Sequence, residues 1–103
     1  MHVLELADHL QLTSDQSAAT RSLMAQHKAE ARRLGARLVE AERHLDVAFR
    51  DKRATQADIR NHTQVIADLQ AAIRASHLQT HLMQTKLLTT AQVDRYNTLR
   101  GYR

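Results

Sequence analysis

Two long runs of this sequence carry apolar or small residues at spacings that alternate between three and four, and the chain contains no proline. That alternation predicts one continuous buried seam along an α-helix. The first seam comprises Met24, His27, Ala31, Leu34, Leu38, Ala41, Leu45 and Ala48, and the second comprises Ile59, His62, Ile66, Leu69, Ile73, Ser76, Thr80, Met83 and Leu87. The pattern therefore favours an all-α chain built on two long helices.

A short polar stretch, residues 51–54, separates the two seams, and Thr55 after it offers a helix cap with Asp58 three positions later. A short connection between long helices predicts an antiparallel helical hairpin. Shorter helices are expected to flank it, so the four predicted helices cover about residues 3–11, 14–51, 56–87 and 90–99 of a single 1–103 domain. Gly35 lies inside the first long helix, where it would permit a close helix approach or a bend.

A five-residue motif, LTxxQ, occurs near both ends of the chain. Its copies are Leu12-Thr13-Ser14-Asp15-Gln16 and Leu88-Thr89-Thr90-Ala91-Gln92. Each copy predicts a capping box, in which the threonine hydroxyl accepts from an amide of the first turn and the glutamine reaches back to the amide of the threonine. Leu88 and Val93 are also placed to form a hydrophobic staple, whereas Leu12 faces Ser17 and has no apolar staple partner. The copies therefore mark two helix starts.

The hairpin register follows from the position of the turn. If the turn centres near residues 53–54, positions whose numbers sum to about 107 face each other. The predicted pairs are then Leu45 with His62, Leu38 with Leu69, Leu34 with Ile73, and His27 with Thr80. A seam this rich in Ala, Ser, Thr and His buries little apolar surface, and small cores are marginal. We therefore expect a homodimer or higher assembly that covers the remaining apolar face.

Composition argues against several classes of protein. The 15 basic and 11 acidic residues give a formal charge of +4, but the two signs alternate and there is no tryptophan, so nucleic-acid binding is not expected. No apolar run approaches the length of a membrane span, and the N-terminal residues do not resemble a signal peptide. Because the chain has no cysteine, no glycine-rich phosphate loop and no HExxH motif, neither an enzyme nor an organic cofactor is expected.

The chain has seven histidines, a high number for its length. His77 and His81 are spaced i, i+4, which puts both imidazoles on one helical face and lets two ligands reach one metal. The predicted register adds His27 from the other helix, and such a set suits Zn²⁺, Cu²⁺, Ni²⁺ or Co²⁺. Solvated or hydrogen-bonded helical histidines are the alternative. Met83 is a soft ligand for Cu(I), but its place on the seam favours packing.

His44 and His62 face one another near the predicted hairpin tip. A hydrogen-bonded interior histidine is the expected role for His62, which lies on the seam. An adventitious metal site or a pH-sensitive pair is the alternative.

The two LTxxQ copies on a hairpin, together with the segment from His77 to Tyr96, resemble the Spy/CpxP superfamily of small periplasmic proteins. The likeness is to its heavy-metal sensor and metal-resistance branch, and it covers nearly the whole chain. It implies a four-helix hooked hairpin, a periplasmic location, homodimers and stress-response roles. Some members are ATP-independent chaperones, and others sense or bind Ni, Co, Zn or Cu.

The resemblance also implies that the N-terminal helix supplies ligands that meet those of the hairpin. In this chain the candidates are Glu5 and His9, spaced i, i+4, where the relatives have two histidines. His2 and Asp8 lie in the same segment. In the relatives the hairpin ligands lie about one turn nearer the LTxxQ leucine.

Three functions follow as expectations. The first is a periplasmic metal-binding or metal-sensing stress-response protein with His77, His81, His27, Glu5 and His9 as ligands. The second is an ATP-independent chaperone that holds unfolding clients on an amphipathic, basic helical surface. The third is a coiled-coil scaffold without a ligand. The expected partners are a second copy, unfolded clients or a membrane signalling protein.

Overall fold

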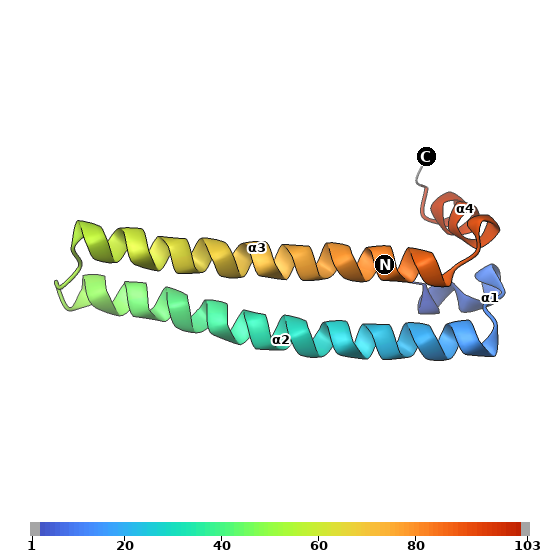
Figure 1. The fold of residues 1–103 in the computed structure, drawn as a ribbon, viewed down its shortest axis with the longest axis horizontal. Helices are drawn as coiled ribbons and strands as arrows, with labels where there is room; N and C mark the ends of the chain where they lie inside the picture. The colour runs from blue at the N-terminus through green and yellow to red at the C-terminus, as the bar shows by residue number, and fades with distance from the viewer. Residues whose placement is uncertain (1–2, 102–103) are drawn as a thin grey trace. The chain divides into compact units, whose positions relative to one another are not determined.

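The computed structural model describes residues 3–101 (Figure 1). They form the 3-10 helix η1 (Leu4–Leu6) and the helices α1 (Ala7–Leu10), α2 (Ser14–Arg50), α3 (Gln56–Leu87) and α4 (Thr90–Leu99), with no strand in this part of the chain. The predictions of an all-α fold and of two long packed helices are confirmed. The predicted first helix is only partly correct, because the backbone leaves helical geometry at Leu6 (φ −108°, ψ 17°) and separates η1 from α1.

The chain divides into two compact units. Unit 1 consists of residues 1–27 and 78–103, and it contains η1, α1, α4, the first turns of α2 and the last turns of α3. Unit 2 consists of residues 28–77, and it contains the rest of both long helices and the turn between them. Each unit has an apolar core of its own. The prediction of a single 1–103 domain stays a prediction.

In unit 2, α2 and α3 run antiparallel and pack along the predicted seams (Figure 1). The buried core residues are Leu34, Ala41, Ile66 and Leu69, and Leu38, Leu45, Ala72 and Ile73 pack against them partly buried. Most of these positions belong to the two three-four patterns of the sequence. The hydrophobic effect on these side chains therefore holds the two helices of unit 2 together.

The turn of unit 2 closes with two capping devices. Lys52 adopts a left-handed conformation (φ 58°), and the amide of Arg53 donates to the carbonyl of Ala48 at 2.9 Å, which ends α2. Thr55 then starts α3: its hydroxyl accepts from the amide of Asp58 at 3.1 Å, and the Asp58 carboxylate accepts from the amide of Thr55 at 3.1 Å. The cap predicted at Thr55 is confirmed.

In unit 1, the short helices enclose a second core beside the ends of α2 and α3. Val3, Leu10, Leu88 and Tyr96 are buried, and Leu6, Leu12, Val93 and Leu99 pack against them. Leu88 and Val93 thus share one cluster, as the staple prediction requires. Leu12 joins the same cluster although it lacks an apolar staple partner on its own helix.

The seam predicted for α3 is wrong at Ile59, which is 40% exposed, and at Met83. The Met83 side chain is 53% exposed, whereas the next residue, Gln84, is fully buried and donates from Nε2 to the hydroxyl of Thr20 at 3.0 Å. The spacing from Thr80 to the buried position is therefore four instead of three, a shift that the 3.6-residue period of a helix produces against a strict seven-residue pattern. Thr20 lies outside the seam predicted for α2, so its contact with Gln84 was not predicted.

Gly35 has a different role from the one expected, because a methyl group added at this position would meet no atom within 4 Å. Close helix approach therefore does not require glycine there. Replacing Gly35 with alanine is expected to stabilise the protein by roughly 0.5–1 kcal/mol, since alanine restricts the unfolded chain and favours the helix. Thermal unfolding measures this gain.

Gly101 is a matched control, because its φ of +75° is unfavourable for alanine. Gly101→Ala should not stabilise the protein. A loss of stability in Gly35→Ala would contradict this interpretation of α2.

Candidate functional site

The two LTxxQ motifs meet in unit 1 through their glutamines. Nε2 of Gln16 donates to Oε1 of Gln92 at 2.7 Å, and Nε2 of Gln92 donates to Oε1 of Gln16 at 3.0 Å. Each glutamine also completes its own capping box: Oε1 of Gln16 accepts from the amide of Thr13 at 2.9 Å, and Oε1 of Gln92 accepts from the amide of Thr89 at 2.9 Å. We call this arrangement the glutamine pair.

The glutamine pair also reaches two backbone carbonyls that lie just before the motifs. Gln16 donates to the carbonyl of Leu87 at 3.0 Å, and Gln92 donates to the carbonyl of Leu10 at 3.2 Å. Each side-chain amide thus makes four hydrogen bonds, the full number that its two donor hydrogens and two acceptor lone pairs allow. The pair therefore fastens the end of α1, the start of α2, the end of α3 and the start of α4 to one another.

The capping boxes were predicted from the sequence, and both are confirmed. The bonds between the two glutamines were not predicted. The available signal was the repetition itself, because two copies of a motif that ends in the same amide can pair reciprocally. This pairing makes LTxxQ a structural element of unit 1.

The predicted metal ligands occupy several elements. Glu5 is exposed on η1 and His9 is exposed on α1, while His27 is partly buried on α2. His77 and His81 are both exposed on α3, His77 in unit 2 and His81 in unit 1. His2 lies outside the described residues.

Between Val3 and Gly101, the structure contains no group of three or more His, Cys, Asp or Glu side chains that could hold a metal ion. Imidazole and carboxylate ligands suit the divalent metals named above. The described geometry does not assemble such a set, so the metal site stays a prediction.

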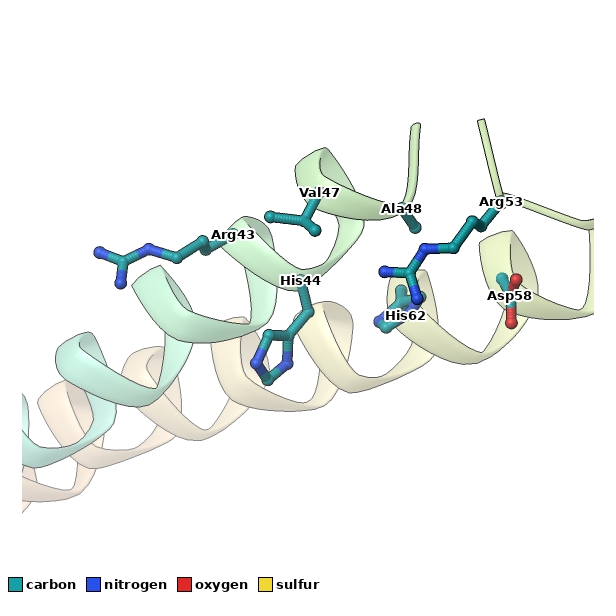
Figure 2. Close-up of a pocket in the computed structure, with 7 residues that line it drawn as sticks. All are labelled: Arg43, His44, Val47, Ala48, Arg53, Asp58 and His62. Carbon is teal, nitrogen blue, oxygen red and sulfur yellow. The ribbon is translucent and has the colours of Figure 1, made fainter. Parts of the chain in front are cut away.

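A separate pocket of about 330 Å³ lies at the turn end of unit 2 (Figure 2). Its lining consists of Arg43, His44, Val47, Ala48, Arg53, Asp58 and His62. His44 and His62 thus border one pocket, as the predicted hairpin placed them. Figure 2 shows the Arg53 side chain extending back from the turn in the direction of His62, whereas Arg43 points away from both histidines.

Ion pairs surround this pocket. Nε2 of His44 lies 3.2 Å from a carboxylate oxygen of Glu40, and Arg43 lies 3.6 Å from the other oxygen of the same carboxylate. Arg53 lies 3.6 Å from Asp51. These side chains are all largely exposed, so each ion pair stabilises the fold little.

One ion pair of α2, between Glu30 and Arg33, shifts the pKa values of both side chains. Arg33 donates to both carboxylate oxygens of Glu30, at 2.6 and 3.1 Å. These hydrogen bonds, together with the guanidinium charge, lower the pKa of Glu30 below its ordinary 4.5 and raise the pKa of Arg33. Because folding lowers the pKa of the Glu30 carboxyl, the ion pair stabilises the folded chain at pH values above the ordinary pKa of that group. This stabilisation is lost as the pH falls through the lowered pKa. Both side chains are about half exposed, so this contribution is small.

Comparison of the chain with models of known protein families, with curated proteins and with solved structures finds no match. Among the described residues, no helix combines the length and apolarity that crossing a membrane requires. The argument about function therefore rests on the residues and their geometry.

Proposed function

We propose that this chain is a stress-response binding protein of the Spy/CpxP type that holds apolar segments of unfolding proteins. The observation that carries the proposal is a set of large apolar side chains left exposed on regular helices. They are Val39, Phe49, Ile59, Val65, Leu78, Leu82 and Met83, each 40–62% exposed. Single exposed apolar residues are common, so the side chains that matter most are those that lie next to one another on one helix.

Each unit, taken by itself, exposes some of these side chains. In unit 1, Leu78 and Leu82 are separated by one helical turn of α3, and Met83 follows directly. Methionine and leucine side chains adapt to partners of different shape, which suits a binder of varied sequences. In unit 2, Val39 borders a surface hollow of about 430 Å³ that Leu38, Glu42, Arg43 and Asp46 also line.

An aggregation-suppression assay tests the proposal. The variant Leu78→Gln/Leu82→Gln is expected to lose most of the suppression, because it removes two exposed apolar side chains from unit 1. Its fold should be retained, since glutamine and leucine have similar helix propensities and both positions are exposed. Circular dichroism checks the helical content.

Gln79→Ala provides the control, because Gln79 is exposed between the two leucines. Unchanged suppression in the double variant would reject the role of this surface. No suppression by the wild-type chain would favour the scaffold function instead.

Metal binding is the second candidate, and the accessibility of His77 and His81 on α3 favours it. Zn²⁺, Ni²⁺, Co²⁺ or Cu²⁺ should bind with an affinity that falls as the pH drops, because imidazole must be neutral to ligate. In His77→Ala/His81→Ala, calorimetry should show no specific uptake while the helical content is unchanged. Equal uptake by wild type and variant would remove this candidate.

The proposal includes two further properties, a homodimer and a periplasmic location. The dimer rests on the small apolar cores of both units. Light scattering at micromolar concentration should show twice the mass of one chain, and a monodisperse monomer would contradict the dimer.

The periplasmic location rests on the resemblance, and fractionation of cells that express the full-length protein tests it.

A further inference from the structure

Four exposed charged side chains of α2 in unit 2 make no ion pair and no side-chain hydrogen bond with the part of the chain that the structure describes. They are Lys28, Arg32, Glu42 and Asp46. Other charges of the same helix are paired within the chain, as Glu30 is with Arg33. These four side chains are therefore available to a partner.

The four charges lie on one side of α2, together with a glycine and an exposed valine. The six residues follow one another at spacings of four and three, which places them within an arc of roughly 80° around the helix. We call this set the α2 stripe, and it consists of Lys28, Arg32, Gly35, Val39, Glu42 and Asp46. The surface hollow of about 430 Å³ beside Val39 opens on its C-terminal half.

The charges of the α2 stripe are separated by sign. Lys28 and Arg32 are spaced i, i+4 in its N-terminal half, and Glu42 and Asp46 have the same spacing in its C-terminal half. Like charges at this spacing destabilise a helix. Opposite charges supplied by a second helix would relieve both repulsions.

The α2 stripe is complementary to itself when two copies run antiparallel. With residue 37 as the midpoint, Lys28 faces Asp46 of the second copy and Arg32 faces its Glu42. A two-fold axis makes each of these pairs occur twice. A parallel arrangement in register would place like charges opposite each other instead. Charge complementarity therefore selects both the partner and its orientation.

The middle of the α2 stripe leaves room for close approach. In the antiparallel alignment Gly35 faces Val39 of the second copy, and Val39 is 59% exposed. A methyl group added at Gly35 would meet no atom within 4 Å, so the space over this residue is open. An apolar centre with a charged rim is the usual anatomy of a protein interface.

We propose that the α2 stripe binds the α2 stripe of a second copy of this chain in antiparallel orientation. The inference rests on the homodimer of the proposed function and names the surface that forms it. It assigns the hollow beside Val39 to the second copy, and it leaves Leu78 and Leu82 of unit 1 to clients.

The experiment measures the dimer Kd by analytical ultracentrifugation for Arg32→Glu and for Glu42→Arg. Each variant should weaken the dimer roughly tenfold, since two exposed charge pairs change from attraction to repulsion. An equimolar mixture of the two variants should regain the wild-type affinity, because each copy then offers the charge opposite to that of the other. Circular dichroism should show unchanged helical content, as arginine and glutamate have similar helix propensities.

Arg37→Glu is the matched control. It makes the same charge change at an exposed position on the opposite side of α2 from Gly35 and Val39, so it should leave the dimer Kd unchanged. Equal weakening by Arg37→Glu, or a mixture of the two stripe variants that stays monomeric, would overturn the proposal.

The failure of this inference is distinguishable from that of the proposed function. A wild-type dimer that neither stripe variant weakens would reject the α2 stripe and keep the homodimer, whereas a monomeric wild type would reject both. Leu78→Gln/Leu82→Gln should keep the mass of the dimer, because both leucines lie on α3. Client binding and pairing of the copies are thus tested separately.

Discussion

Replacing Tyr96 with alanine is expected to destabilise unit 1 by about 3–5 kcal/mol, the usual cost of truncating a buried aromatic side chain. Tyr96 is only 2% exposed and is the largest side chain in the cluster formed with Val3, Leu10 and Leu88. Its loss leaves a cavity where α4 packs against the rest of the unit. Amides of α4 should therefore lose their protection from hydrogen exchange, and the thermal midpoint should fall.

Tyr96→Phe is the matched control, since it keeps the ring in the cluster. It should retain most of the stability of the wild type. If the alanine variant unfolds at the wild-type temperature and α4 stays protected, the cluster does not hold α4 in place.

Replacing Gln92 with alanine is expected to cost roughly 1–3 kcal/mol, because it leaves partly buried groups without their hydrogen-bond partner. The groups affected are the side-chain amide of Gln16, the carbonyl of Leu10 and the amide of Thr89. At about 4–8 °C per kcal/mol for a chain of this size, the thermal midpoint should fall by roughly 4–24 °C. Calorimetry or circular dichroism measures this shift.

Two comparisons separate the glutamine pair from ordinary capping. Thr89→Ala removes the hydroxyl cap alone and should cost roughly 0.5–2 kcal/mol. The double variant Gln16→Ala/Gln92→Ala should cost less than the sum of the single variants, because both singles break the same reciprocal bonds. Strict additivity would show that the glutamines act only within their own capping boxes.

The capping boxes show how much of the local structure the sequence determines. A threonine followed three positions later by a glutamine or an aspartate predicts a helix start, because donor and acceptor lie within one turn of the backbone. Thr13, Thr55 and Thr89 all cap as predicted. The predicted ends of α2, α3 and α4 agree with the structure to within one residue.

The seam of unit 2 was also predictable. Alternating spacings place Leu34, Ala41, Ile66 and Leu69 on facing helix sides, and these four are buried. The prediction failed at Met83, where the burial moves to Gln84. A periodic pattern describes one helix at a time. Which residue of α3 is buried in unit 1, however, depends on the side chain of Thr20 in α2, to which Gln84 donates a hydrogen bond.

The candidate sites depended more strongly on tertiary structure. Spacing suggested that His77 and His81 bind one metal ion together, but spacing alone does not bring a third ligand close, and the described residues show no set of three. The pocket at the turn was only partly predicted: the hairpin placed His44 opposite His62, while the presence of Arg53 in the same lining depends on how the turn folds back (Figure 2).

By itself, then, the sequence determined the helices α2, α3 and α4, their starts and the apolar seam of unit 2, because capping signals and apolar spacing can be recognised within each helix. Only the tertiary structure decided the partners of Gln16 and Gln92, the burial of Gln84 and the side chains that meet at the turn. Those contacts join residues far apart in the sequence, and their geometry exists only once the helices have packed.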